Sequence, residues 1–124
     1  IIGDSDLTIE PNEHLIVKER MNHEELKQIT EKTAVYVCVC NLHGTQIPGK
    51  VYHYVDTGKP ILVILDGEYS KKMREFFESF QRFYLCDNNV IDIKKTLQII
   101  VKENKSFEVP DLLKPSFIAA EFIK

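Results

Sequence analysis

The sequence predicts an α/β fold, a Rossmann-like three-layer sandwich with a mainly parallel sheet of about five strands. Its 124 residues, 44% hydrophobic and 28% charged, have the composition of one globular domain. Short apolar runs alternate with longer amphipathic segments, which is typical of β-α-β units. Two of the runs, 34–40 and 60–65, are apolar throughout, as expected of strands covered on both faces in a parallel sheet.

The first part of the chain contains a strand candidate and a helix candidate. Residues 14–18 read as a strand, and residues 1–3 look like the end of another. Asn22 is placed to cap a helix, with Glu25 at the third position of a capping box. Leu26 and Ile29 follow at helical spacing, so we expect a short helix that lies on a sheet.

The later elements alternate between strand and helix. We expect a strand at 34–40, a helix at 50–56 ended by Gly58, a strand at 60–65, a helix at 69–80, a strand at 83–86 and a helix at 91–101. The helix at 69–80 carries several large apolar side chains at helical spacing, which we expect in the core rather than around a cofactor: Met73, Phe76, Phe77 and Phe80.

Composition excludes several classes of function. The net charge is −3 and there is no basic block, which argues against nucleic acid as a partner. The longest apolar run, 60–65, is far shorter than the ~20 residues of a membrane span, and no signal peptide is visible, so we expect a cytoplasmic protein. The three cysteines are expected to be reduced and buried, and no metal site or cofactor is predicted.

A candidate ligand site follows from the predicted sheet, because ligands bind beyond the carboxyl ends of parallel strands. The longest polar loop at that edge, 41–49, leads into a helix. Free N–H groups at the helix start suit a phosphate, Gly49 would allow close approach, and Lys50 adds a positive charge. His53 lies on roughly the same face. Alone, these residues are more often an ordinary turn, a solvated lysine and a structural histidine.

A longer motif surrounds these residues: Ile47-Pro48-Gly49-Lys50-Val51-Tyr52, then Tyr54, then Thr57-Gly58-Lys59-Pro60-Ile61-Leu62. It resembles the carboxyl-terminal domain of retaining glycosyltransferases of the group 1 (family 4) type, which have the GT-B architecture. The similarity extends from about residue 14 to residue 100.

This resemblance implies a nucleotide-diphosphate sugar donor, with Gly49 and Lys50 facing the diphosphate. The loop with Arg20 and Met21 would lie beside the nucleobase. The family's pair of glutamates falls at Thr45 and His53, and the second usually binds the ribose hydroxyls. Imidazole can hydrogen-bond a hydroxyl but is not the charged acceptor that a carboxylate is. The catalytic residues are unknown.

The chain ends suggest a piece of a longer enzyme. The sequence opens without methionine and closes on an apolar stretch, so we expect 1–124 to be a single, partial nucleotide-sugar-binding domain. Residues 115–124 resemble the terminal helix that returns toward the amino-terminal domain. That domain would be a partner, the exposed apolar ends would favour self-association, and the fragment alone would be inactive.

Two other functions remain open. A flavodoxin-like binding or regulatory module would accommodate five strands; Asp66 follows a strand as a phospho-acceptor would, but the expected acidic cluster and lysine loop do not surround it. A degenerate, non-catalytic interaction domain is the other alternative.

Overall fold

The computed structural model describes residues 1, 8–47, 49–108 and 110. The chain divides into two units, Ile1–Thr33 and Ala34–Lys124, and each is described by itself. Two expectations lie outside the described residues: the strand at the very start of the chain, which includes residues 2 and 3, and the terminal helix at 115–124.

The first unit contains one helix, α1 (His23–Lys32), among its described residues. It begins as predicted, because the Asn22 side chain accepts a hydrogen bond from the Glu25 N–H at 2.9 Å. Among the described residues, 14–18 does not form the predicted strand: Leu15 makes an isolated antiparallel bridge with Asn12, and the Lys18 N–H donates to the Ile1 carbonyl at 2.8 Å. The Asn12 side chain accepts from the His14 N–H at 2.8 Å, and this local bond favours a tight turn over an extended strand.

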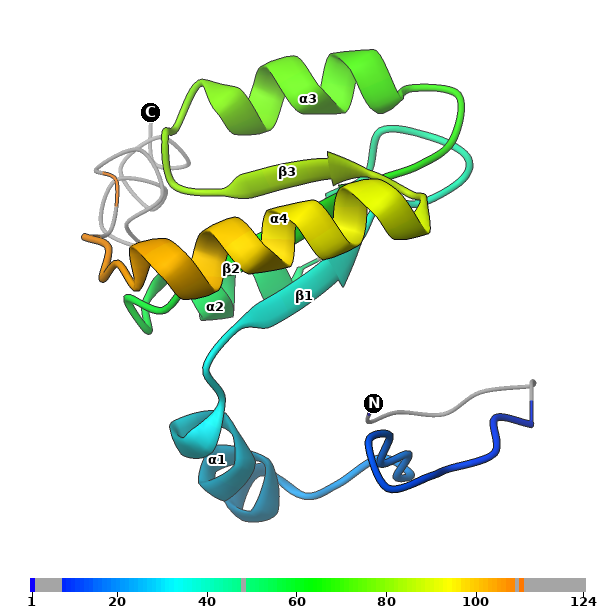
Figure 1. Ribbon diagram of the computed structural model, residues 1–124, viewed down its shortest axis with the longest axis vertical. Coiled ribbons are helices and arrows are strands. Elements are labelled where there is room, and N and C mark those ends of the chain that lie inside the picture. The colour runs from blue at the N-terminus through cyan, green and yellow to red at the C-terminus, as the bar shows by residue number, and fades with distance from the viewer. Residues whose placement is uncertain (2–7, 48, 109, 111–124) are drawn as a thin grey trace, which may run out of the picture. The chain divides into compact units, whose positions relative to one another are not determined.

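The second unit is an α/β fold with a three-stranded parallel sheet and Rossmann-like topology (Figure 1). Its elements alternate along the chain: β1 (Tyr36–Val39), α2 (Lys50–Val55), β2 (Ile61–Leu65), α3 (Ser70–Glu78), β3 (Tyr84–Asp87) and α4 (Val90–Glu103). The strand order is β1-β2-β3, with Val37 opposite Leu62 and Val63 opposite Leu85. Among the described residues the sheet therefore has three strands rather than the expected five or so.

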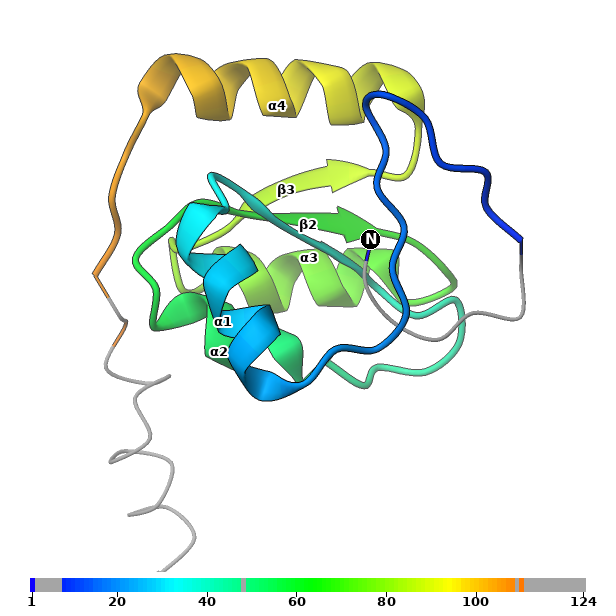
Figure 2. The same ribbon diagram turned by 90° about the horizontal axis from the view of Figure 1, so that it is seen from below.

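Helices cover the two faces of this sheet unequally. Figure 2 shows α2 and α3 on one face and α4 on the other. The α2–α3 side holds the larger core, in which Val51, Val55, Met73 and Phe77 are buried against the sheet. Phe80 packs against the same core, whereas Phe76 is 36% exposed. The prediction of a packed aromatic helix is thus confirmed for most of its side chains.

Within the second unit, the described residues leave the side of β1 that faces away from α2 half-exposed. The side chains of Val37 and Val39 are 51% and 50% exposed, because α4 packs over β2 and β3. All five residues of β2 are buried, as predicted for a strand covered on both faces. For 34–40 the described residues do not show the same coverage, since Val37 and Val39 are half-exposed.

The cysteines agree with the sequence-based expectation. Cys38, Cys40 and Cys86 are free and buried, and burial raises the pKa of each thiol, so the thiols are protonated at neutral pH. Among the helices within the described ranges, none has the length and apolar character needed to cross a bilayer.

Candidate functional site

The carboxyl ends of the three parallel strands meet at one edge of the sheet, and the loops that leave them are joined by hydrogen bonds. The Asn88 side chain donates to Asp66 Oδ2 at 2.9 Å, which links the loop after β3 to the loop after β2. The Glu68 N–H donates to the Leu42 carbonyl at 3.3 Å, which links the loop after β2 to the loop after β1. All three loops therefore form one connected rim.

Gly67 is a glycine that this rim requires. Its φ is +84°, a left-handed conformation that disfavours side chains. A Cβ there would also press against the carbonyl oxygens of Leu42 and Asn41, the second at 2.7 Å. The left-handed φ and the close carbonyl oxygens together explain why this position is a glycine.

Gly49, at the start of α2, has no such structural reason. Its φ of −59° and ψ of −27° are ordinary helical values. A Cβ at Gly49 would meet no atom within 4 Å, and the residue is exposed. The space above its backbone is open to a ligand.

Lys50 and His53 lie on the exposed side of α2, whereas Val51 and Val55 are buried on the opposite side. Residues three apart are neighbours on a helix surface, so the two basic side chains share one face. No side chain caps the start of α2, and the first N–H groups of a helix have no acceptor within it. Burial raises the pKa of Cys38, and the nearby Lys50 ammonium opposes that rise.

The structure brings Gly49, Lys50 and His53 together on α2. Arg20 and Met21 belong to the first unit, where they directly precede the cap of α1; Arg20 is exposed and Met21 is half-buried. Thr45 is exposed in the loop before α2.

The sequence analysis missed the side chains that connect the rim. The bond between Asp66 and Asn88 and the ion pair between Arg74 and Asp87, whose nitrogen and oxygen lie 3.0 Å apart, were not predicted. A polar residue directly after an apolar strand was the available signal for Asp66 and Asp87.

Asp66 gains no support as a phospho-acceptor. Its Oδ1 accepts from the Gly67 N–H at 2.8 Å and its Oδ2 accepts from Asn88. In the part of the chain that the structure describes, no three His, Cys, Asp or Glu side chains gather into a possible metal site. The rim thus offers hydrogen-bonded loops and the cation of Lys50.

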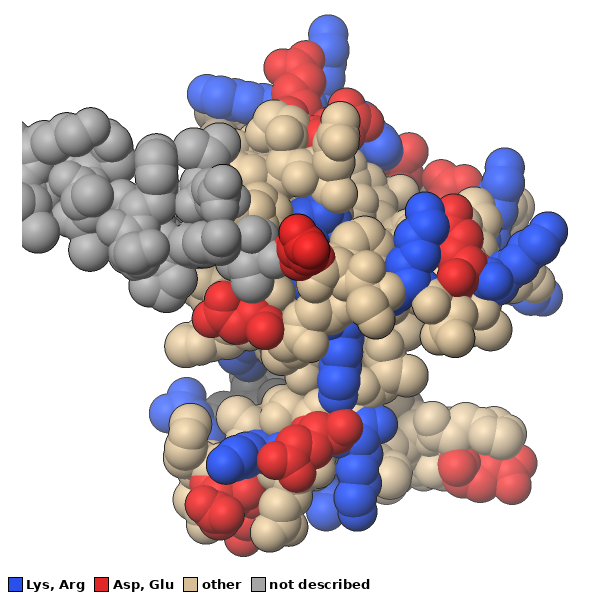
Figure 3. All heavy atoms as spheres, turned by 90° about the vertical axis from the view of Figure 1, so that its left-hand side faces the viewer, with Lys and Arg blue, Asp and Glu red and all other residues tan. Residues whose placement is uncertain are grey.

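Charges of both signs are mixed on the face of the molecule shown in Figure 3, where basic and acidic side chains alternate among uncharged ones.

Comparison of the chain with models of protein families, with curated proteins and with solved structures found no match in any of the three.

Proposed function

We propose that this chain binds the nucleotide-sugar donor of a glycosyltransferase, and that the whole enzyme transfers the sugar to a saccharide or lipid-linked acceptor. The observation that carries the proposal is Gly49. Neither its backbone angles nor its surroundings require glycine, yet it begins a helix at the edge where parallel sheets bind ligands. A diphosphate against the first N–H groups of α2 would require it, because a side chain would stand in the way.

Lys50 supplies the positive charge in this proposal. When the glycosidic bond of the donor breaks, negative charge develops on the leaving diphosphate, and preorganised cations and N–H groups stabilise it. Because α2 has only six residues, the attraction comes from its free first-turn N–H groups and Lys50 rather than from a long helix dipole.

His53 would contact the ribose of the same ligand. It lies three residues after Lys50 on the exposed face of α2, and an imidazole can donate or accept a hydrogen bond with a ribose hydroxyl. The roles of Arg20 and Met21 beside the nucleobase rest on the resemblance alone.

The amino-terminal domain of the proposed two-domain enzyme would supply the acceptor site. The enzyme would act in the cytoplasm, or at the cytoplasmic face of a membrane. We therefore expect purified 1–124 to bind nucleotide but not to transfer sugar.

Calorimetric titration with UDP and with GDP tests the site. We expect saturable binding of at least one nucleotide, and a loss of about tenfold or more in affinity (~1.4 kcal/mol) for Lys50→Ala. Lys95→Ala is the matched control, because Lys95 is an exposed lysine on α4. His53→Glu should change the affinity, because it replaces imidazole with the family's carboxylate.

Equal affinity in the wild type and Lys50→Ala would place the nucleotide elsewhere and contradict the proposal. If neither nucleotide binds to 1–124 or to the full-length protein, the degenerate interaction domain is the better description.

A further inference from the structure

The chain that leaves α4 is fastened to the loop that follows α2. α4 ends at Asn104, whose left-handed φ of +45° turns the chain out of the helix. Three residues later, the Phe107 N–H donates to the Gly58 carbonyl at 2.9 Å. A Cβ at Gly58 would lie 3.1 Å from the Phe107 carbonyl oxygen. The two backbones therefore approach each other closely.

The Phe107 side chain covers the guanidinium of Arg82. The ring centre lies 4.7 Å from the guanidinium carbon, and Tyr84 meets the same ring edge-on, with ring centres 5.9 Å apart. Phe107 is half-buried, whereas Arg82 is only 1% exposed. The attraction between a cation and an aromatic face is stronger where water is excluded. Phe107 thus stabilises Arg82 in its buried position.

Arg82 in turn holds the carboxyl end of α2. Its Nη2 donates to the carbonyls of Val55, the last residue of the helix, and of Lys59. The last carbonyls of a helix have no N–H partner within it, and a cation beside them is favourable. Water that reached Arg82 would compete for both carbonyls and weaken these bonds. The cover that Phe107 provides therefore strengthens the attachment of α2.

α2 depends on such contacts because it is short. Helices below ~12–15 residues are marginal in isolation, and α2 has six residues. Val51 and Val55 are buried against the sheet, and Tyr54 stacks on Tyr36 with ring centres 4.2 Å apart. These contacts hold the side of the helix, and no side chain caps its start. Arg82 fixes its carboxyl end.

We propose that Phe107 is a latch on α2. While its ring lies on Arg82, α2 is held in place, and α2 is released when the chain after α4 is drawn away from this position. Lys50 and His53 belong to the same short helix, with about 7.5 Å of helix axis between Lys50 and Val55, so release displaces both side chains. The chain after α4 therefore regulates the donor site, a step that rests on the function proposed above.

Amide hydrogen exchange of the 124-residue chain, without nucleotide, tests the latch. Phe107→Ala should speed the exchange of the Tyr54 and Val55 amides, in the last turn of α2, about tenfold or more, and should change the amides of α3 less. Phe107→Leu keeps an apolar contact but loses the ring, so it should show the same pattern at a smaller size.

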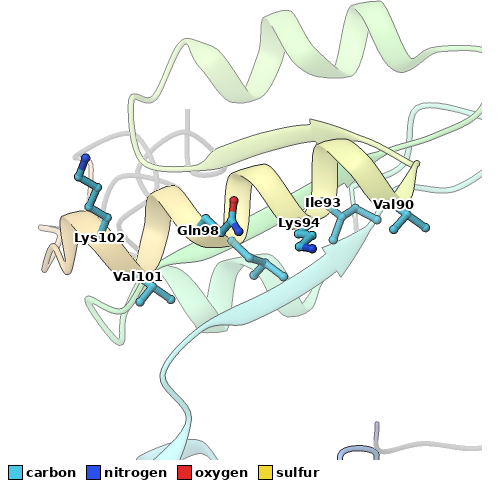
Figure 4. A pocket seen from close by; sticks show the side chains of 7 residues that line it. Val90, Ile93, Lys94, Gln98, Val101 and Lys102 are labelled. Carbon is cyan, nitrogen blue, oxygen red and sulfur yellow. The ribbon is translucent and has the colours of Figure 1, made fainter.

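Ile93→Ala is the matched control. Ile93 is also half-buried, but it lies on α4, on the other face of the sheet from α2, where it lines a groove of about 630 Å³ (Figure 4). Its loss should not speed exchange in α2 selectively. A selective effect on α2 in this control would overturn the proposal. If neither Phe107 variant speeds exchange in α2 more than in α3, the latch is overturned as well.

Nucleotide measures the consequence for the donor site. Whichever of UDP and GDP binds the wild type should bind Phe107→Ala about tenfold more weakly, and its saturation should slow exchange of the Phe107 amide, because coupling is reciprocal. Equal affinities for the wild type and Phe107→Ala would overturn the regulation of the site. If neither nucleotide binds the wild type, the proposed function fails, and the exchange rates without nucleotide still decide the latch.

Discussion

Gly49 and Gly67 both lie at the carboxyl edge of the sheet, but only Gly67 has a backbone conformation and surroundings that disfavour a side chain. Gly67→Ala should lower the free energy of unfolding by about 2 kcal/mol or more, because it combines a left-handed φ with contact against two carbonyl oxygens. Gly49→Ala should change it by less than ~1 kcal/mol, because its φ is helical and its surroundings are open. Urea unfolding followed by circular dichroism measures both. Similar losses for the two variants would contradict our account of Gly49.

Arg82 is a buried cation at the opposite edge of the sheet, only 1% exposed. Its Nη2 donates to the carbonyls of Val55 and Lys59, at 3.2 and 3.0 Å, and its guanidinium lies 4.7 Å from the centre of the Phe107 ring. Its Nε and Nη1 have no hydrogen-bond partner among the described residues. The side chain thus holds the end of α2 at the cost of two buried guanidinium nitrogens that have no partner among the described residues.

Two substitutions at Arg82 separate the effect of the volume that it fills from the effect of its hydrogen bonds. Arg82→Ala should lower the free energy of unfolding by about 2–4 kcal/mol, because it leaves a cavity and two carbonyls without their donor. Arg82→Met should cost less, because it fills most of the space and removes the two buried nitrogens that have no partner among the described residues. Equal losses in chemical denaturation would show that the two hydrogen bonds, rather than the volume, dominate.

At the scale of elements, β3 and the last turn of α4 are joined by one bond, from the Tyr84 hydroxyl to the Glu103 carboxylate. Burial and this bond raise the pKa of Tyr84 to about 12, and the bond lowers the pKa of Glu103. The bond needs a protonated tyrosine and an ionised glutamate. The bond therefore contributes its full stabilisation at pH values between the ordinary pKa of glutamate, about 4.3, and that of tyrosine, about 10.

Tyr84→Phe should lower the free energy of unfolding at pH 7. The difference from wild type should shrink as pH falls through the lowered pKa of Glu103, and as pH rises from about 10 to 12. Denaturation at several pH values measures it. Tyr52→Phe is the control, since Tyr52 is 38% exposed and should show no such dependence. A pH-independent difference for Tyr84→Phe would mean that lost packing, not the bond, explains the effect.

Most elements could be predicted because their signals are local. The Asn22 cap and the helical spacing of Met73 and Phe77 depend on neighbouring residues, and the structure confirms both helices. Among the described residues the strand predicted at 14–18 is not formed, because the side chain of Asn12 stabilises a turn at 12–15 that an apolar run does not reveal. The exposure of Val37 could not be predicted, because it depends on how far α4 extends across the sheet.

At the scale of the whole molecule, parallel topology explains what the sequence could and could not predict about the candidate site. A strand followed by Gly49 and Lys50 places both residues at the carboxyl edge in any parallel sheet, so their position was predictable. The link between Asp66 and Asn88 joins residues 22 positions apart, and it requires the order of the strands in space. The nucleotide, the sugar and the acceptor are not encoded in these features.

The central claim is that a nucleoside diphosphate binds at the start of α2. A ¹⁵N–¹H spectrum of the chain, titrated with UDP and with GDP at fixed protein concentration, tests it most directly. We predict that saturable amide shifts are largest at Gly49, Lys50 and His53. Shifts that are largest on α4 instead, or no saturable shift with either nucleotide, would contradict the claim.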